Sequence, residues 1–185
     1  MDVFLDASAL ALRAATAGAA ARAAEGVIGR WANPCAPSGL AAERLPVCDW
    51  VSRALADVAP QRAALASAFA AIEGQLRWVR RASAAQQDQR FWNGHANAVI
   101  LGPGGLEPRD DLWVGVTVMA PGVDYVDHSH APEEVYLSLS PGEWWNSAMD
   151  WTDPGPEGAI YNPPGITHAM RSGTQPFLAL WYLPL

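Results

Sequence analysis

The apolar residues of this chain change their spacing near residue 90, and this change limits the folds open to it. Before that point they follow a helical period, as in the series Leu65, Phe69, Ile72, Leu76 and Val79. The spacings of four, three, four and three predict one amphipathic helix over residues 60–81. After residue 90, short apolar or alternating segments are separated by Gly and Pro, which is typical of strands joined by tight turns.

The two halves therefore predict two structural regions. Further helices are expected over residues 6–24 and 48–58, with a Pro-rich loop over 35–46. The clearest predicted strands are 98–101, 112–119, 134–140, 159–161 and 177–183. Many short strands at near-regular spacing favour a small antiparallel barrel. We expect an N-terminal helical region over residues 1–92, packed on a barrel over residues 93–185.

The amino-acid composition limits the functions that this chain can have. Half of the residues are apolar and 17% are charged, which excludes wholesale disorder. All twelve basic residues are Arg, which excludes lysine Schiff-base chemistry and a P-loop lysine. Residues 1–100 carry ten Arg and eight acids, a net of +2, whereas residues 101–185 carry two Arg and eleven acids, a net of −9. The strong negative charge of the second half disfavours nucleic-acid binding, because the phosphate backbone would be repelled. It is compatible with binding a metal cation or a cationic substrate.

The sequence also bears on compartment and topology. Cys35 and Cys48 are expected to be ordinary thiols, with a structural disulfide as the less favoured alternative. The Ala-rich N-terminus lacks a basic leader region, since Asp2 and Asp6 come first, so it is interpreted as a helix. No run of eighteen strongly apolar residues occurs, so no membrane span is expected. We expect a cytoplasmic protein.

Three of the four histidines lie in the acidic half. His128 and His130 are two residues apart, so both imidazoles face one side of an extended strand. Glu134 and Tyr136 are likewise two apart on the next segment, and His168 follows in a separate Pro-Gly turn. Three imidazoles and one carboxylate suit a borderline divalent metal, and the spacing does not distinguish Zn, Fe(II), Mn, Co and Ni.

Each of these features also has a simpler explanation. An H-x-H pair alone arises often by chance, and it is the addition of Glu134 and His168 that favours a metal site. His95 has no partner pattern and is assigned a structural role. Glu133 points to the opposite face from Glu134 and is expected to be solvated.

Two segments resemble the motifs of the cupin family. Gly122, His128-Ser-His130 and Glu134 follow the first motif, and the segment over 158–168 resembles the second. There are turn-level departures: Gly142 comes one residue late, Gly158 is one residue nearer to Pro163 than usual, and Ser172 stands where Asn is usual. The resemblance covers residues 95–185. It implies a double-stranded β-helix, or jelly-roll, barrel with a metal site.

Among cupins, the chain resembles the helix-prefixed dimethylsulfoniopropionate (DMSP) lyases. The resemblance rests on Tyr136 two residues after Glu134, on His168 thirty-two residues later, on the segment 134–146 and on the Trp-Tyr-Leu-Pro terminus. It implies that one divalent metal is bound by His128, His130, Glu134 and His168. It also implies that Tyr136 is the general base and that Tyr125 contacts the substrate or assists.

The implied substrate is a small zwitterion with a sulfonium and a carboxylate. The reaction removes the proton beside the carboxylate and releases dimethyl sulfide and acrylate. A metal on the carboxylate would stabilise the developing charge, and aromatic faces would hold the sulfonium. The aromatic residues available in this half are Trp113, Trp144, Trp145, Trp151, Trp181, Tyr125, Tyr161 and Tyr182.

Other functions stay open from the sequence. An Fe(II) cupin dioxygenase uses the same ligand types, would consume oxygen and would need no Tyr at position 136. A metal-dependent binding or sensor cupin would bind its ligand without turnover, although the basic helix-turn-helix expected of such a sensor is missing. A lyase-like member acting on another substrate is a further possibility. A monomer or a homodimer is expected.

Overall fold

The computed structural model describes residues 1–32, 34–82 and 89–185. The α-helices are α1 (Asp2–Ala15), α2 (Gly18–Arg30), α3 (Asp49–Ala56), α4 (Ala63–Glu73) and α5 (Gln89–Gly94), and single 3₁₀ turns, η1 (Pro46–Cys48) and η2 (Pro60–Arg62), precede α3 and α4. The strands are β1 (Trp78–Val79), β2 (His95–Leu101), β3 (Leu112–Met119), β4 (Asp124–His128), β5 (Glu134–Ser138), β6 (Glu143–Asn146), β7 (Met149–Thr152), β8 (Ile160–Asn162), β9 (His168–Arg171) and β10 (Phe177–Pro184).

The described strands form two antiparallel sheets. One has six strands in the order β1-β2-β3-β10-β5-β8, and the other has four in the order β4-β9-β6-β7. The centre of the larger sheet is the eight-residue pairing of β10 with β3, from Phe177 opposite Met119 to Pro184 opposite Leu112. The fold is mainly β with a helical N-terminal region, as predicted, and has the arrangement of a cupin barrel.

Alternation along the strands of the larger sheet separates two buried faces. On one face, Ala98, Val116 and Leu180 belong to the core that also contains Phe4 and Val27 of the first two helices. On the other face, Asn97, Thr117 and Trp181 line a cavity. Because successive side chains on a strand point to opposite faces, the same three strands supply both the core and the cavity wall.

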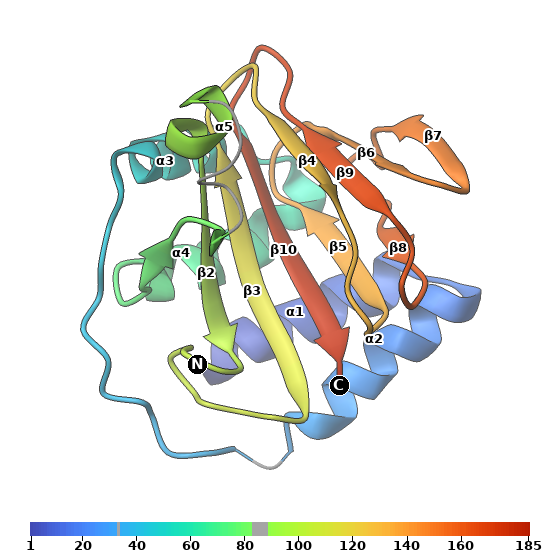
Figure 1. Cartoon of the computed structure of the whole chain (residues 1–185). Helices are drawn as coiled ribbons and strands as arrows, with labels where there is room; N and C mark the ends of the chain where they lie inside the picture. The colour runs from blue at the N-terminus through green and yellow to red at the C-terminus, as the bar shows by residue number, and fades with distance from the viewer. Residues whose placement is uncertain (33, 83–88) are drawn as a thin grey trace.

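The N-terminal helices cover the face of the larger sheet that is turned away from the cavity. Figure 1 shows α1 and α2 lying behind and below the long strands, while β4 and β9 lie on the opposite side. Tyr182 on β10 donates a hydrogen bond to Ser8 of α1 at 3.0 Å, and both residues are fully buried. One core cluster runs from Phe4 to Tyr182, so it spans the predicted boundary at residue 92. The division into 1–92 and 93–185 stays a prediction.

The predicted helix over residues 60–81 was wrong beyond Glu73. Helix α4 ends there, and Trp78 and Val79 instead pair with Ala98 and Asn97 of β2. The apolar period continues through Leu76 and Val79 only by coincidence: Leu76 is buried, but Val79 is 43% exposed on a strand. The Arg residues at positions 77, 80 and 81 therefore lie beyond the end of the helix.

The N-terminal helix was also predicted as one segment, whereas the chain forms two. Thr16 and Ala17 are extended, and Gly18 has φ +57°, a conformation that L residues rarely adopt. Arg13 of α1 and Glu25 of α2 form an ion pair across this turn. Cys35 is exposed and Cys48 is buried, and both are free thiols. Among the described residues, no helix has the length and apolar character needed to cross a bilayer.

The strand predictions were correct for β3, β5, β8 and β10 within one or two residues, and β2 starts three residues earlier than predicted. The short strands β4, β6, β7 and β9 were missed, because their polar and aromatic residues do not alternate clearly. Two site residues are placed differently as a result. His128 is the last residue of β4 with His130 beyond it, and His168 opens β9 and does not lie in a turn.

Candidate metal centre and its cavity

A cavity of about 220 Å³ lies between the two sheets. Its wall combines apolar and aromatic groups with a few polar side chains, as is common in small-molecule sites. It is lined by Arg81, Asn97, Val99, Trp113, Thr117, Tyr125, His128, His130, Glu134, Tyr136, Met170, Trp181 and Leu183.

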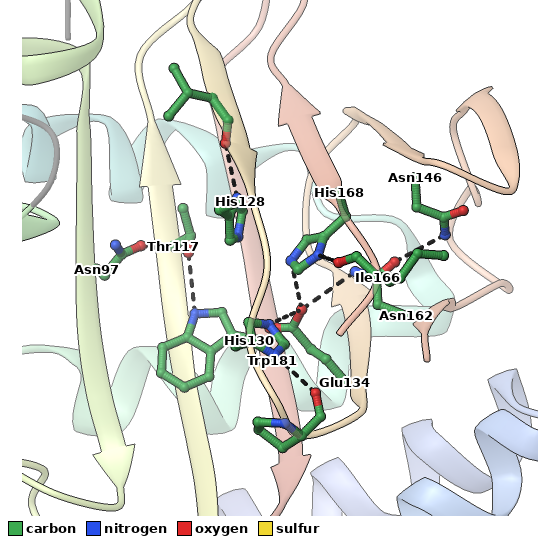
Figure 2. A network of polar contacts seen from close by, with 12 residues as sticks. Asn97, Thr117, His128, His130, Glu134, Asn146, Asn162, Ile166, His168 and Trp181 are labelled. Carbon is green, nitrogen blue, oxygen red and sulfur yellow. Dashed lines mark hydrogen bonds and ion pairs between the residues drawn. The ribbon is translucent and has the colours of Figure 1, made fainter. Parts of the chain in front are cut away.

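Three of the four predicted ligands form a compact cluster at the edge of this cavity: His130 and Glu134 line it, and His168 is buried behind them. One ligand atom from each of His130, Glu134 and His168 lies within 4.8 Å of the others. Glu134 Oε2 is 3.2 Å from His130 Nε2 and 3.3 Å from His168 Nε2 (Figure 2). Glu134 comes from β5, His168 from β9 and His130 from the connection after β4, so the cluster joins both sheets.

Backbone carbonyls determine the tautomer of the three imidazoles at this site. The Nδ1 atoms of His128, His130 and His168 lie 2.9, 2.9 and 3.0 Å from the carbonyl oxygens of Val126, Pro132 and Ile166. A carbonyl oxygen only accepts, so each Nδ1 must carry the proton. In the neutral ring, Nε2 is then left with a lone pair, which is the form in which histidine binds metals.

His168 supplies the test of whether a cation fits this cluster. Its Nε2 atom is buried and has no hydrogen-bond partner among the described residues, although Glu134 Oε2 lies at 3.3 Å. When the His168 ring is neutral, its Nε2 lone pair and the carboxylate oxygen of Glu134 face each other at short range with no proton between them. A mixed set of imidazole nitrogens and a carboxylate oxygen suits a borderline divalent ion, so the residues fit such a metal.

The charges of the cluster depend strongly on burial. Burial raises the pKa of Glu134, but its contacts with His130 and His168 outweigh this and lower it to about 2. For His130, burial lowers the pKa, but the hydrogen bond and charge of Glu134 prevail and raise it. The cluster thus keeps an ionised carboxylate in a buried position.

His128 lies beside the cluster but outside the three-residue group. Its ring centroid is 4.0 Å from that of His168 and 6.3 Å from that of His130. Burial, followed by the neighbouring His168, lowers the pKa of His128 to about 3, so this ring stays neutral. Its place as a fourth ligand stays a prediction.

Two asparagines that the sequence reasoning missed hold Glu134 in place. Asn162 is the register partner of Glu134 and donates its Nδ2 hydrogen to Oε2 at 3.4 Å. Asn146 is the register partner of His168 and donates to Asn162 Oδ1 at 3.0 Å. Both are buried. Asn146 ends the segment 134–146, but nothing local in the sequence links it to residue 162.

The two predicted catalytic tyrosines both line the cavity. Tyr136 is 3% exposed, and burial together with the Glu134 charge raises its pKa well above the usual value. Tyr125 is 4% exposed, and its ring centroid lies 5.1 Å from that of His128. The phenol oxygen of Tyr125 accepts a hydrogen bond from Asn97 at 2.9 Å.

The remaining aromatic candidates divide into cavity and non-cavity residues. Trp113 and Trp181 line the cavity. Trp144 packs in the core between Tyr136 and Phe177, and Trp151 is 38% exposed, with its ring under Arg171.

Three sequence assignments outside the cluster are also decided. Glu133, expected to be solvated, is half-buried and accepts a 2.6 Å hydrogen bond from Tyr161. Tyr182 points toward the helices and not into the cavity. His95 is fully buried and uses both ring nitrogens, in contacts with the Phe91 carbonyl and the Arg81 amide, in keeping with its structural assignment.

Fold and site together define a helix-prefixed cupin barrel with a candidate metal centre in its cavity. Residues 19–179 match the dimethylsulfoniopropionate lyase family. The chain belongs to this family.

Individual relatives agree with that assignment. The chain is 31% identical over 121 residues to the dimethylsulfoniopropionate lyase DddQ of Ruegeria pomeroyi strain DSS-3, a match that covers 64% of this chain and 59% of that protein. A solved structure of the DMSP lyases RdDddP and RnDddQII matches all of this chain and 91% of its own, with a TM-score of 0.78 and 23% identity. The crystal structure of DddQ from Ruegeria pomeroyi DSS-3 matches with a TM-score of 0.77, 23% identity and 92% of its own length. These structures establish the common fold.

Proposed function

We propose that this protein is a carbon–sulfur lyase that cleaves DMSP to dimethyl sulfide and acrylate by β-elimination. The observation that carries the proposal is that Tyr136 lines the same cavity as His130 and Glu134, two members of the His130–Glu134–His168 cluster, in a chain of the DMSP lyase family. The curated relative is a DMSP lyase, and the match spans 59% of its length.

One divalent transition metal is the proposed cofactor, with Zn, Fe(II), Mn, Co and Ni all compatible with the donor set. His130, Glu134 and His168 would hold it through the atoms that face one another, with His128 as the fourth ligand. A divalent ion bound there supplies positive charge, which lowers the pKa of a neighbouring phenol and stabilises negative charge developing on the substrate carboxylate.

Tyr136 is the proposed general base. Its phenolate oxygen would take the proton from the carbon beside the substrate carboxylate. The electron pair of that C–H bond then forms the new C=C bond. The C–S bond breaks with its electrons on sulfur, so neutral dimethyl sulfide leaves and acrylate remains. Tyr136 follows Glu134 on the cavity face of β5, which places the phenol beside the charged cluster.

The sulfonium end of the substrate is proposed to bind against the aromatic part of the wall. Trp113 and Trp181 both line the cavity, and the faces of such rings attract cations.

Headspace dimethyl sulfide above metal-loaded protein and DMSP tests the proposal. We expect release by the wild type and loss of nearly all release by Tyr136→Phe, with the metal content of that variant unchanged. Oxygen uptake is measured in the same vessel. Oxygen consumption without dimethyl sulfide would favour the dioxygenase, and ligand binding without either product would favour a binding protein. The cytoplasmic location and the monomeric or homodimeric state stay predictions.

A further inference from the structure

A chain of three hydrogen bonds runs along the cavity wall from Trp181 to Tyr125. Trp181 Nε1 donates to Thr117 Oγ1 at 3.2 Å (Figure 2), Thr117 Oγ1 lies 2.7 Å from Asn97 Oδ1, and Asn97 Nδ2 lies 2.9 Å from the Tyr125 hydroxyl oxygen. The first three residues are on the adjacent strands β10, β3 and β2, and Asn97 and Thr117 are register partners. The chain ends at Tyr125 on β4, in the other sheet.

The chemistry of the first donor determines the direction of this chain. An indole N–H can only donate, so Thr117 Oγ1 accepts from Trp181. The hydroxyl of Thr117 then has one proton to give, and the 2.7 Å separation from Asn97 Oδ1 is that of an O–H···O bond. With the carbonyl of the Asn97 amide engaged, its NH₂ group faces Tyr125. Tyr125 is therefore an acceptor toward Asn97.

The Tyr125 hydroxyl consequently keeps its own proton for another partner. Within the described part of the chain, no group accepts a hydrogen bond from it. The ring itself is held in place, with edge contacts to Phe91 at 4.9 Å and to His95 at 5.4 Å between centroids. Since Tyr125 lines the cavity and is only 4% exposed, the acceptor for this proton has to come from the cavity.

Charge at this end of the cavity favours an anionic acceptor. The Arg81 guanidinium lies 5.8 Å from the Tyr125 ring centroid, and Arg81 also lines the cavity. Tyr125 also neighbours His128, the proposed fourth metal ligand, with 5.1 Å between ring centroids, so this end of the cavity adjoins the metal centre near which the substrate carboxylate is proposed to bind. Thr117 is buried, and a buried polar group costs stability unless it is paired, as Thr117 is with Asn97 and Trp181.

We propose that Asn97 and Thr117 are positioning residues that hold Tyr125 as a hydrogen-bond donor toward the carboxylate of the ligand. The inference rests on the proposed function, which supplies a substrate and a product that both carry a carboxylate. Tyr125 touches the ligand, whereas Asn97, Thr117 and the Trp181 N–H act through it.

Binding of acrylate to the metal-loaded protein tests this assignment, with two substitutions at position 97. In Asn97→Asp the new carboxylate has only acceptor oxygens. It would accept hydrogen bonds from the hydroxyls of both Thr117 and Tyr125, so the Tyr125 proton would point away from the cavity. Asn97→Leu removes the hydrogen bonds without reversing Tyr125. We expect Asn97→Asp to weaken acrylate binding roughly tenfold or more, and Asn97→Leu to weaken it less. A merely structural role predicts the opposite order, because leucine removes every hydrogen bond of the amide.

Position 117 provides a matched pair. Thr117→Val removes the hydroxyl that orients the amide, and Thr117→Ser restores it in a smaller side chain. We expect the valine variant to bind acrylate more weakly and the serine variant to recover the lost affinity. Metal content is measured for every variant and should not change, because neither residue contacts the cluster. Equal acrylate affinity in the wild type, Asn97→Asp and Thr117→Val would overturn the proposal.

A spectroscopic measurement separates this inference from the proposed function. The ultraviolet resonance Raman difference between wild type and Tyr125→Phe isolates the tyrosine doublet of residue 125, whose intensity ratio reports whether the phenol donates or accepts. We expect acrylate to shift this ratio toward donation in the wild type and to leave it unchanged in Asn97→Asp. If the wild type releases no dimethyl sulfide, the proposed function fails. The doublet still reports whether the Tyr125 hydroxyl donates or accepts. If the wild type and Asn97→Asp have the same intensity ratio without acrylate, the role of Asn97 is refuted.

Discussion

Glu134 and Asn162 face each other across the β5–β8 pairing, and the side-chain amide of Asn162 donates to the carboxylate oxygen that contacts both His130 and His168. The carboxylate therefore has a defined rotamer before any ion arrives. Groups that orient a ligand in this way commonly contribute as much to metal affinity as some direct contacts do.

Replacing Asn162 with Leu should weaken metal binding by about 10- to 100-fold, because Glu134 loses the donor that orients it. Competition with a chromophoric chelator measures this affinity without reference to turnover. Asn93→Leu is the matched control, since Asn93 is exposed and contacts only Gln89 among the described residues. Unchanged affinity in Asn162→Leu would show that the amide does not hold the carboxylate.

The four predicted ligands can be ranked by metal content after dialysis. His130→Ala and His168→Ala should lose most of the bound metal, because their Nε2 atoms belong to the compact cluster with Glu134. His128→Ala should also lose metal if its neutral ring is the fourth ligand. His95→Gln is the histidine control and should keep its metal. Wild-type content in His128→Ala would leave a three-residue site.

Gly115 determines where the Trp181 ring lies. The two residues are register partners, and a Cβ at position 115 would overlap the Trp181 ring and press on the Ala98 carbonyl. Gly115→Ala should therefore displace the indole from the cavity wall, raise KM for DMSP and lower the stability by about 1–3 kcal/mol.

The control for this prediction is Gly173→Ala, because nothing lies within 4 Å of a Cβ at that position. Urea unfolding and steady-state kinetics measure the two effects separately. If Gly115→Ala keeps the wild-type KM, the position of the indole is not important for substrate binding.

His95 should make the fold sensitive to acid. Burial lowers its pKa below the usual 6.5, and the charges of Arg80 and Arg81 act in the same direction, against the Phe91 carbonyl. The unfolded chain therefore binds this proton more readily than the folded chain does. The stabilisation is complete above about pH 6.5 and is lost as the pH falls from there toward the lowered folded value.

Chemical unfolding at pH 7.5 and at pH 5.5 measures this effect. The wild type should lose more stability between the two values than His95→Gln, which cannot be protonated. Comparing the two proteins cancels the contribution of the other histidines. An identical loss in both would mean that His95 titrates normally in the folded protein.

The local sequence was enough to find the candidate metal cluster in outline. Glu134 and Tyr136 share a strand face because side chains alternate, and this requires only a spacing of two. The helical residues were less predictable. The helical spacing of apolar residues continued through Leu76 and Val79, although α4 ends at Glu73 and Val79 lies on a strand. In this region the chain pairs with β2, so the spacing of its apolar residues does not report a helix face.

The supporting residues could not be found in the same way. Asn162 reaches Glu134 from 28 positions away, and Thr117 reaches Asn97 from 20 positions away. Such contacts depend on which strands pair and in which register, and no short pattern records that choice.

By itself, the sequence determined the order of a helical part and a β part, the inward face of the longer strands and the residue types able to hold a metal. These follow from local periodicity and from side-chain chemistry. Only the tertiary structure decided that the polar ends of β4, β5 and β9 meet at one site, that His128 lies beside the three-residue group, and that Tyr125 accepts a hydrogen bond from Asn97 in the other sheet. The physical reason is that backbone pairing between distant strands sets those positions, and it is decided by the packing of the whole chain.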